Sequence, residues 1–170
     1  MKSLPNSPIR VARVDYGNPA DCSALVMLLD AYACDPMGGG EPLAAAVKER
    51  LCADLARQPG AASFLAWNAT GEAVGLINCF LGFSTFAAKP LLNIHDVVVH
   101  AAQRRQGIGQ ALLYWAEQRA RELGCCKLTL EILSGNSLAM ASYVRAGYAP
   151  YVLDPAAGQA LLMQKLLPES

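Results

Sequence analysis

The sequence predicts an α/β fold, in which helices cover the faces of a mixed β-sheet within one domain. Several segments alternate apolar and polar residues, as strands do, while others repeat apolar residues at steps of three and four, as helices do. Glycine and proline separate these segments from one another. The chain has 170 residues, of which 54% are hydrophobic and only 16% charged. That composition supplies a real core and is not that of a disordered protein.

The first half of the chain is expected to begin with a strand, two helices and a hairpin. Between the helices, the segment DPMGGGEP at 35–42 carries two prolines and three glycines, which interrupt regular structure. In order, the elements are a strand at 9–14, a helix from Pro19, a second helix at about 43–58, and two strands within 63–81 around a turn at 68–71.

The second half adds a strand apolar enough to be covered on both faces, and then two helices alternate with strands. Glycine follows each of the two helices, and the segment SGNS offers an N-cap to the second. The elements are a strand at 90–99, a helix from Ile108 to Leu123, a strand at 126–133, a helix at 137–146, and a final pair of strands at 148–153 and 159–167. The complete order is β-α-α-β-β-β-α-β-α-β-β.

Charge and cysteine content narrow the functional classes. Fourteen basic residues balance fourteen acidic ones, which argues against a nucleic-acid-binding surface. No apolar run is long enough for a membrane span, and the first ten residues lack the apolar centre of a signal peptide, so we expect a soluble cytoplasmic protein. The six cysteines show no C-x-x-C spacing and are interpreted as small buried side chains rather than metal ligands, although Cys125 and Cys126 are adjacent.

A doubly basic turn, RRQGIG at 104–109, separates the strand at 90–99 from the following helix. Helix N-termini carry unpaired N–H groups, glycine allows close approach of the main chain, and arginine binds phosphate oxygens with two donors. A dinucleotide-binding loop would need a third glycine where Leu112 stands, and the Gly-Lys-Ser/Thr of triphosphate-binding loops is absent. The turn therefore predicts a local phosphate site, with a solvated basic turn as the alternative.

Two motifs support the phosphate site. Residues 104–109 fit the pattern Arg/Gln-x-x-Gly-x-Gly/Ala, and about 27 residues later Asn136, Ala139, Tyr143 and Gly147-Tyr148 fit Asn-x-x-Ala-x-x-x-Tyr-x-x-x-Gly-aromatic. Together they resemble the GCN5-related N-acetyltransferase (GNAT) superfamily over roughly residues 9–167. The resemblance implies a mainly antiparallel sheet of about six or seven strands with about four helices. It also implies transfer of an acetyl group from acetyl-coenzyme A to an amine.

The resemblance implies a role for each matched residue. The backbone of Val97, Val98 and Val99 is expected to pair with the pantetheine arm of coenzyme A and to offer an N–H to the acyl oxygen. Asn136 is expected to reach the pantetheine or to help splay the strands around it. Tyr143 stands at the position of the general acid that protonates the leaving thiolate, unless its ring only packs on the sheet. The pyrophosphate is expected to bind Arg104, Arg105, Gln106, Gly107, Ile108, Gly109 and Gln110.

A narrower resemblance, to diamine and thialysine acetyltransferases, covers residues 82–99. Where those enzymes have Leu-Glu-Asp, this chain has Ile94-His95-Asp96, so His95 replaces a candidate base. Imidazole accepts protons near neutrality but does not attract a polycation as a carboxylate does. Strand alternation places His95 and Asp96 on opposite faces unless a bulge intervenes. Three alternatives for the base follow: His95, Asp96, and a water chain or Glu131.

The leading function is an acetyl-CoA-dependent N-acetyltransferase that acts on the primary amine of a small molecule, such as an amino acid, a diamine or a related amine. Alternatives are a peptide or protein N-terminal acetyltransferase, and a coenzyme-A-binding sensor without turnover. By analogy of fold, acceptor residues are expected around the loop after the first helix and in the segment FSTF. They are Tyr32, Asp35, Met37, Phe83 and Ser84. No metal, nucleic-acid or membrane partner is expected, and a homodimer is common in the family.

Overall fold

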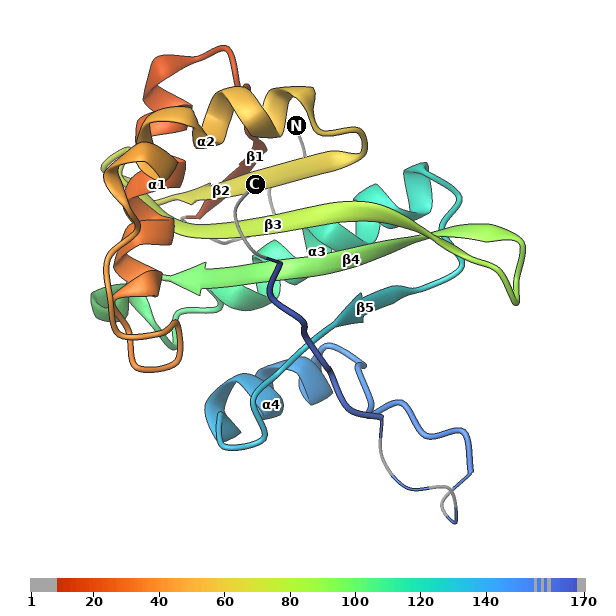
Figure 1. The fold of residues 1–170 in the computed structure, drawn as a ribbon. Helices are drawn as coiled ribbons and strands as arrows, with labels where there is room; N and C mark the ends of the chain where they lie inside the picture. Colours follow the sequence, from red (N-terminus) through yellow and green to blue (C-terminus); the bar gives the residue numbers. More distant parts are fainter. Residues whose placement is uncertain (1–8, 155, 157, 159, 168–170) are drawn as a thin grey trace.

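The computed structural model describes residues 9–154, 156, 158 and 160–167 (Figure 1). Its helices and strands follow the predicted order up to the last helix, and the α/β prediction is confirmed. The elements are β1 (Arg10–Arg13), α1 (Pro19–Ala33), α2 (Ala45–Arg57), β2 (Ala61–Trp67), β3 (Ala73–Ser84), β4 (Lys89–Val99), the 3-10 helix η1 (Ala101–Gln103), α3 (Ile108–Glu122), β5 (Leu128–Leu130) and α4 (Ser137–Arg145).

The strands form one mixed sheet in the order β1-β2-β3-β4-β5. The first four pair antiparallel with their neighbours, and β5 pairs parallel with β4. Short connections explain two of the three antiparallel pairs, because a tight turn reverses the chain between β2 and β3 and again between β3 and β4, whereas α1 and α2 lie between β1 and β2. The parallel pair needs a crossover, which α3 supplies.

Helices cover both faces of the sheet, and each face has its own apolar layer (Figure 1). Helices α1 and α2 cover one face, where Leu25 and Leu28 of α1 pack with Leu76 and Val98 of the sheet. Helix α3 covers the other face, where Leu112 packs among side chains that include Ile77 and Ile94. Strand β4 contributes to both layers, as its continuous apolar sequence predicted. The two faces are named below after α1 and α3.

A β-bulge interrupts β4 at His95. Asn78 of β3 pairs with Asp96, but the next residue, Cys79, pairs with Ile94, so His95 has no partner on β3. An extra residue of this kind shifts the alternation of side chains along a strand. Before the bulge Ile94 packs in the layer on the α3 face, and after it Val98 packs in the layer on the α1 face.

Strand β5 is shorter than the predicted segment 126–133. Its pairing with β4 joins Leu92 to Leu128 and ends where Ile94 meets Leu130, directly before the bulge. Figure 1 shows the chain after β5 turning away from β4 toward α4. Beyond Ile94, the edge of β4 therefore has no neighbouring strand within the described part of the chain.

The prediction of two C-terminal strands was wrong for the described residues. Residues 148–153 and 160–167 form no strand, and Gln159 lies outside the described residues. The alternating pattern predicted strands, but a strand needs a neighbour to receive its hydrogen bonds and a surface to cover its apolar side chains. Neither segment pairs with a strand among the described residues, and most of their apolar side chains are uncovered, since Leu153 and Leu161 are 83% and 82% exposed.

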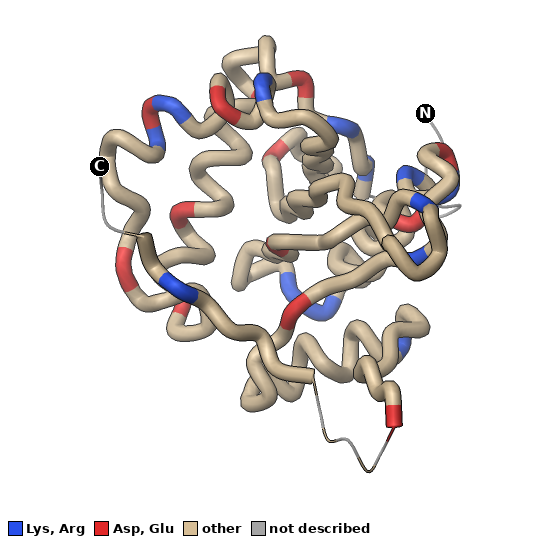
Figure 2. Tube along the Cα trace, turned by 45° about the vertical axis from the view of Figure 1, so that its right-hand side comes forward, with Lys and Arg blue, Asp and Glu red and all other residues tan. Residues whose placement is uncertain are grey.

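Charged residues of both signs are interspersed along the chain (Figure 2), which agrees with a formal net charge of zero. Among the residues that the structure describes, no helix has the length and apolar character needed to cross a membrane.

Candidate active site

The predicted phosphate turn forms the N-terminus of α3. The chain leaves β4 through η1, and Gly107 is the N-cap of α3 with a φ of +81°. Arg105 also adopts a positive φ, of +66°, which is uncommon for a residue with a side chain. Such a conformation persists only where the surroundings impose it, and it is often found at ligand-binding loops.

The backbone of this turn presents a run of free donors. The first hydrogen bond of α3 joins the N–H of Ala111 to the carbonyl of Gly107, and the six N–H groups of residues 105–110 have no acceptor among the described residues. A Cβ placed on Gly107 would meet no atom within 4 Å, so the space above the turn is open. Free N–H groups at a helix N-terminus attract anions, and the turn therefore fits a phosphate group.

The side chains of the turn divide into two groups. Arg104 is held by protein partners, since its guanidinium donates to the carbonyl of Val99 at 3.2 Å and to Asp35 at 3.0 Å. The amide of Gln110 donates to the carbonyl and hydroxyl of Ser142, which fastens α4 to α3. Arg105 has no ion pair or hydrogen bond in the described part of the chain. We therefore expect Arg105 and the backbone to contact an anion first.

The free edge of β4 leads from this turn into the sheet. The N–H of His100 donates to Val74 of β3, and hydrogen-bonding direction alternates along a strand, so the N–H groups of Val97 and Val99 point to the opposite, open edge. Val98 pairs toward β3 instead. An extended ligand can therefore bind beside Val97 and Val99 as an additional strand would.

The bulge brings His95 and Asp96 to the α1 face together. The imidazole of His95 is exposed and packs edge-on against Phe80, with ring centroids 5.3 Å apart. The carboxylate of Asp96 is partly buried and accepts a hydrogen bond from the side-chain amide of Asn78 at 2.9 Å. The condition left open by the sequence is thus met, because a bulge removes the strict alternation between these neighbours.

Two tyrosines complete the cluster. Burial raises the pKa of Tyr143 on α4 above its usual value, and the nearby Tyr32 and Asp96 raise it further. Burial also raises the pKa of Tyr32 on α1, with further contributions from Asp96 and Asp35. Both phenols therefore stay protonated at neutral pH. Tyr143 is in addition packed against Tyr148, at 6.0 Å between ring centroids.

Of the remaining predicted residues, two lie in the loop after α1 and one begins α4. Asp35 and Met37 follow α1, where the hydroxyl of Tyr32 approaches the carbonyl of Met37 at 3.4 Å. Asn136 is the N-cap of α4 and accepts from the N–H of Ala139, so its carbonyl oxygen shapes the helix start.

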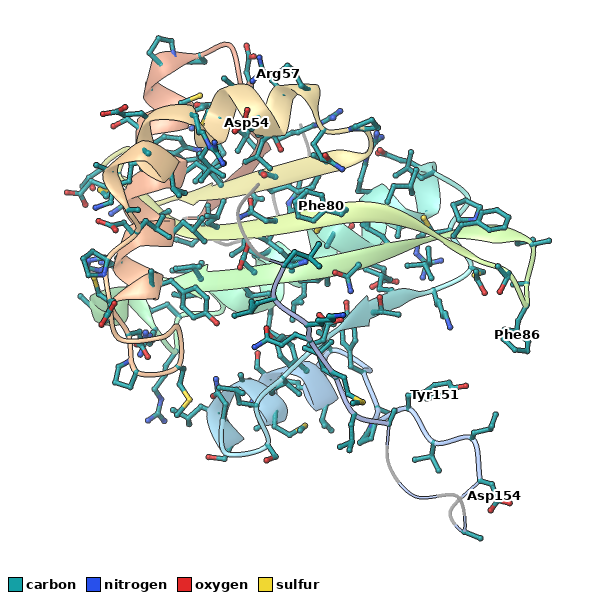
Figure 3. The ribbon with its side chains drawn as sticks, viewed as in Figure 1. Asp54, Arg57, Phe80, Phe86, Tyr151 and Asp154 are labelled. Carbon is teal, nitrogen blue, oxygen red and sulfur yellow. The ribbon has the colours of Figure 1, made fainter. Side chains whose placement is uncertain are left out.

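The structure does not bring Phe83 and Ser84 to this cluster. They end β3, where Phe83 pairs with Pro90, six residues before Asp96, which is roughly 20 Å along an extended strand. Figure 3 shows Phe86 at the tip of this hairpin and Phe80 over the middle of the sheet. The reason is that β3 and β4 continue beyond the rest of the sheet, which carries the FSTF segment away from α1.

The sequence reasoning did not identify Asn78, or Ser63 and Tyr16 behind it, as part of the site. Ser63 and Asn78 are buried polar residues, 1% and 3% exposed, within otherwise apolar strands. A polar residue in the middle of an apolar strand was the available signal, but only the pairing of β2, β3 and β4 shows that these residues meet Asp96.

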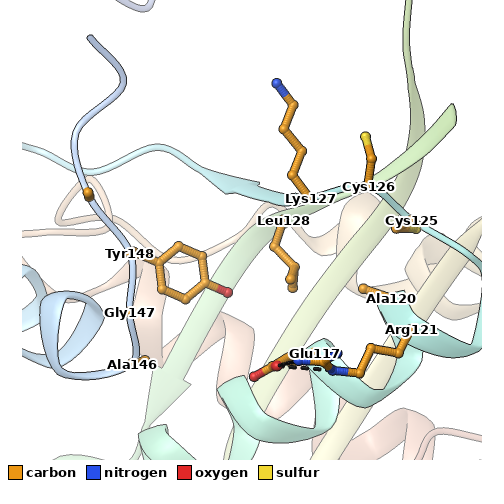
Figure 4. A pocket seen from close by; sticks show the side chains of 11 residues that line it. Glu117, Ala120, Arg121, Cys125, Cys126, Lys127, Leu128, Ala146, Gly147 and Tyr148 are labelled. Carbon is orange, nitrogen blue, oxygen red and sulfur yellow. Dashed lines mark hydrogen bonds and ion pairs between the residues drawn. The ribbon is translucent and has the colours of Figure 1, made fainter. Parts of the chain in front are cut away.

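A separate pocket of about 430 Å³ lies between α3, β5 and the segment after α4 (Figure 4). Its lining includes the hydroxyl-bearing ring of Tyr148, the thiols of Cys125 and Cys126, and the ion pair of Glu117 with Arg121. None of the predicted site residues lines it. The cluster around Asp96 and the turn at 104–110 is therefore the better candidate for an active site.

Comparison with known proteins decides the family. The model of the acetyltransferase (GNAT) family matches residues 25–148, which is more than half of the chain and includes both motifs. The chain belongs to this family. The resemblance seen in the sequence is thereby confirmed, and the GNAT fold accounts for the mixed sheet, although the described strands are fewer than predicted.

Two curated relatives match parts of this GNAT chain. A streptothricin acetyltransferase of Streptomyces lavendulae is 36% identical over 94 residues, 55% of this chain and 48% of the relative. An aminoalkylphosphonate N-acetyltransferase of Salmonella typhimurium is 36% identical over 78 residues, 46% of this chain and 51% of the relative. The chain thus spans about half the length of these relatives.

Among solved structures, an aminoglycoside acetyltransferase from an uncultured soil metagenomic sample, in complex with trehalose, has the same fold. It superposes with a TM-score of 0.74 at 20% sequence identity, over 96% of this chain and 99% of that one. At this identity the likeness concerns the fold alone.

Proposed function

We propose that residues 9–167 act as one catalytic domain, an N-acetyltransferase that transfers an acetyl group from acetyl-CoA to the primary amine of a small molecule by direct attack. The observation that carries this proposal is the bulge in β4. It brings His95 and Asp96 to the α1 face at the point where the open edge of β4 begins, and Asp96 lies near Tyr32 and Tyr143. The edge leads from there to the free N–H groups of the turn at 105–110.

The residues present fit coenzyme A. The N–H groups of residues 105–110, with Arg105, would bind its pyrophosphate, and the open edge at Val97 and Val99 would bind its pantetheine arm. Bound acetyl-CoA supplies an acetyl thioester, whose acyl carbon gains a bond to the amine nitrogen while its bond to sulfur breaks. The N–H of Val97 would donate to the acyl oxygen, where negative charge develops.

Asp96 and His95 would prepare the amine. At neutral pH a primary amine is mostly an ammonium ion, which must lose a proton before it can attack. The partly buried carboxylate of Asp96 is suited to hold and orient this cation. The exposed imidazole of His95 is suited to accept the released proton and pass it to solvent.

Tyr143 would provide the proton that the departing sulfur needs. Its raised pKa keeps the phenol protonated at neutral pH, so a proton is available in each cycle. Its ring packs against Tyr148, and its hydroxyl lies near enough to Asp96 for the carboxylate to influence it. The proton that leaves the amine through His95 and the proton that reaches the thiolate from Tyr143 balance, and solvent restores both groups.

A small amine is supported as the acceptor. One relative is named for an aminoalkylphosphonate, a small molecule that carries an amino group. In this chain the Asp35–Arg104 ion pair ties the loop after α1 to the phosphate turn, and Tyr32 near the end of α1 lies close to Asp96.

The test is incubation with acetyl-CoA and a panel of amines while free thiol is measured. The panel comprises lysine, putrescine, aminoethylphosphonate, an aminoglycoside and a short peptide with a free N-terminus. Thiol release that depends on one of the small amines supports the proposal. Release with the peptide alone would assign N-terminal acetylation, and coenzyme-A binding without release on any amine would assign a sensor.

A further inference from the structure

A chain of hydrogen bonds crosses the layer under the α1 face and ends at Asp96. The hydroxyls of Tyr16 and Ser63 lie 2.8 Å apart, Ser63 donates to the side-chain carbonyl of Asn78 at 2.6 Å, and the amide of Asn78 donates to Asp96 at 2.9 Å. The chain starts after β1, crosses β2 and β3, and reaches β4 at its bulge. It therefore links the segment after β1 and two strands, β2 and β3, to one carboxylate on β4.

All donors in this series of hydrogen bonds point the same way, from Tyr16 toward Asp96. The side-chain carbonyl of Asn78 can only accept, so the hydroxyl proton of Ser63 is committed to it. Tyr16 must then donate to Ser63. The amide nitrogen of Asn78 faces Asp96, which as a carboxylate only accepts. Because the carboxylate of Asp96 only accepts, the amide of Asn78 has one satisfied orientation, with its nitrogen toward Asp96 and its carbonyl toward Ser63.

Burial makes this orientation costly to abandon. Ser63 and Asn78 are 1% and 3% exposed and lie among leucines of the layer, including Leu65 and Leu76. Water does not reach these groups to replace a lost partner, and a buried polar group without a hydrogen bond is strongly unfavourable. A partly buried carboxylate is thus held by a donor that cannot easily turn away.

The hydrogen bonds reach β4 at Asp96, the residue proposed to bind the acceptor. Asn78 and Asp96 are paired residues, and the register shifts directly after them. The bulge leaves β4 less constrained at His95 and Asp96 than a regular ladder would. The hydrogen bond from Asn78 compensates for this, since it fixes the carboxylate that would otherwise depend on the bulged backbone alone.

We propose that Asn78, oriented by Ser63, is a positioning residue that fixes the carboxylate of Asp96 to bind the ammonium group of the acceptor. The inference rests on the proposed function, because it assigns Asp96 to the amine. Asn78 is too buried to meet the substrate itself. It acts through Asp96, and its removal should weaken binding of the amine and leave binding of acetyl-CoA unchanged.

The experiment measures kcat, the KM of the best panel amine, the KM of acetyl-CoA and the Tm. Its variants are Asn78→Leu, Ser63→Ala, Ser63→Thr, Asp96→Asn and the double variant Asn78→Leu/Asp96→Asn. Leu65→Ala is the matched control, because Leu65 lies on the same strand and face as Ser63 but takes no part in the hydrogen bonds that lead to Asp96. It should lower the Tm without raising the KM of the amine.

We expect Asn78→Leu to raise the KM of the amine about tenfold with the KM of acetyl-CoA within about twofold of wild type. Ser63→Ala should raise the KM of the amine by a smaller factor. Ser63→Thr keeps the hydroxyl, and its KM for the amine should be close to that of wild type. The double variant should be no worse than Asp96→Asn, because Asn78 acts only through that carboxylate.

The outcomes separate the inference from the function on which it rests. If Asp96→Asn raises the KM of the amine but Asn78→Leu does not, or if the two effects add in the double variant, the positioning role is wrong and the function stands. If Asp96→Asn leaves the KM unchanged, the assignment of Asp96 to the amine is wrong, and the positioning role falls with it.

A second measurement needs no turnover. In isotope-labelled protein, the side-chain amide resonances of Asn78 should show one orientation with slow hydrogen exchange. Ser63→Ala and Asp96→Asn should each shift these resonances and speed the exchange, while Leu65→Ala should not. Resonances that do not respond to either change would overturn the inference, even if no panel amine is acetylated.

Discussion

Replacing Gly107 by valine should have two separate effects. The side chain should strain the backbone, which has a positive φ at this position, and it should also block a ligand from the N–H groups of the phosphate turn. Gly107 has a φ of +81°, and a Cβ there would meet no protein atom within 4 Å. Gly71, in the turn between β2 and β3, has a φ of +82° and equally open surroundings, which makes it a matched control. A side chain in this conformation costs roughly 1–2 kcal/mol at either position.

The two variants should therefore lose similar stability and differ in ligand binding. A cost of roughly 1–2 kcal/mol corresponds to about 2–8 °C in Tm for a chain of this size. Gly107→Val should in addition weaken coenzyme-A binding at least tenfold, about 1.4 kcal/mol, because its side chain occupies the space above the free N–H groups. Calorimetric titration of both folded variants is the assay. Wild-type affinity in Gly107→Val, or equal weakening in Gly71→Val, would refute the placement of the pyrophosphate.

Further predictions concern three residues near the turn, which are Tyr143, His95 and Asp35. Tyr143→Phe should lower kcat by about 10²–10⁴ with little change in coenzyme-A affinity or Tm; turnover within about threefold of wild type, with chemistry rate-limiting, would remove the hydroxyl from the mechanism. Because burial raises the pKa of Tyr143, wild-type kcat should not fall through its ionisation below about pH 10, which a pH–rate profile checks. His95→Ala should depress kcat/KM at neutral pH, measured with the same amine, because the imidazole accepts the proton from the ammonium group. An unchanged kcat/KM would assign that proton to Asp96 or to water. The hydrogen bond from the N–H of Met37 and then the guanidinium of Arg104 lower the pKa of Asp35. Asp35→Asn should therefore be less stable than wild type above about pH 4, and the difference in Tm should vanish as pH falls through that lowered pKa. A difference in Tm that does not depend on pH would contradict the ion pair.

The phosphate turn and the motif on α4 could be predicted from the sequence because their physics is local. Gly107 needs a positive φ, the N–H groups that follow it belong to one helix start, and Asn136 caps the helix that carries Tyr143. Each of these features depends on a few neighbouring residues. Their identities in the chain are therefore sufficient to indicate the structure that they form.

The bulge and the hydrogen-bond chain behind Asp96 depend on pairing between strands, which the sequence does not reveal. Strand alternation alone would separate His95 from Asp96, and only the register of β3 against β4 shows that they share a face. Ser63 and Asn78 are similarly brought together by the pairing of β2 with β3. The contacts join residues 15 and 18 positions apart, and their formation follows from the topology.

The ends of the sheet show the opposite failure, in which a local pattern predicted too much. Residues such as Leu153 and Leu161 alternate as strand residues do, but no neighbouring strand receives them. The hairpin that carries Phe83 was expected near the acceptor because its sequence resembles a segment of diamine acetyltransferases. The length of β3 and β4 instead carries it away from α1.

A single-turnover experiment with isotopically labelled acetyl-CoA tests direct transfer to an amine most directly. Enzyme in excess would be mixed with the labelled cofactor and the best panel amine, and mass spectrometry would follow both the intact protein and the small products. We expect the label to pass to the amine nitrogen at the rate of thiol release, with no acetylated protein formed on the way. Label that first accumulates on the protein, for example on one of its six free cysteines, and then passes to the amine at a competent rate would contradict direct attack.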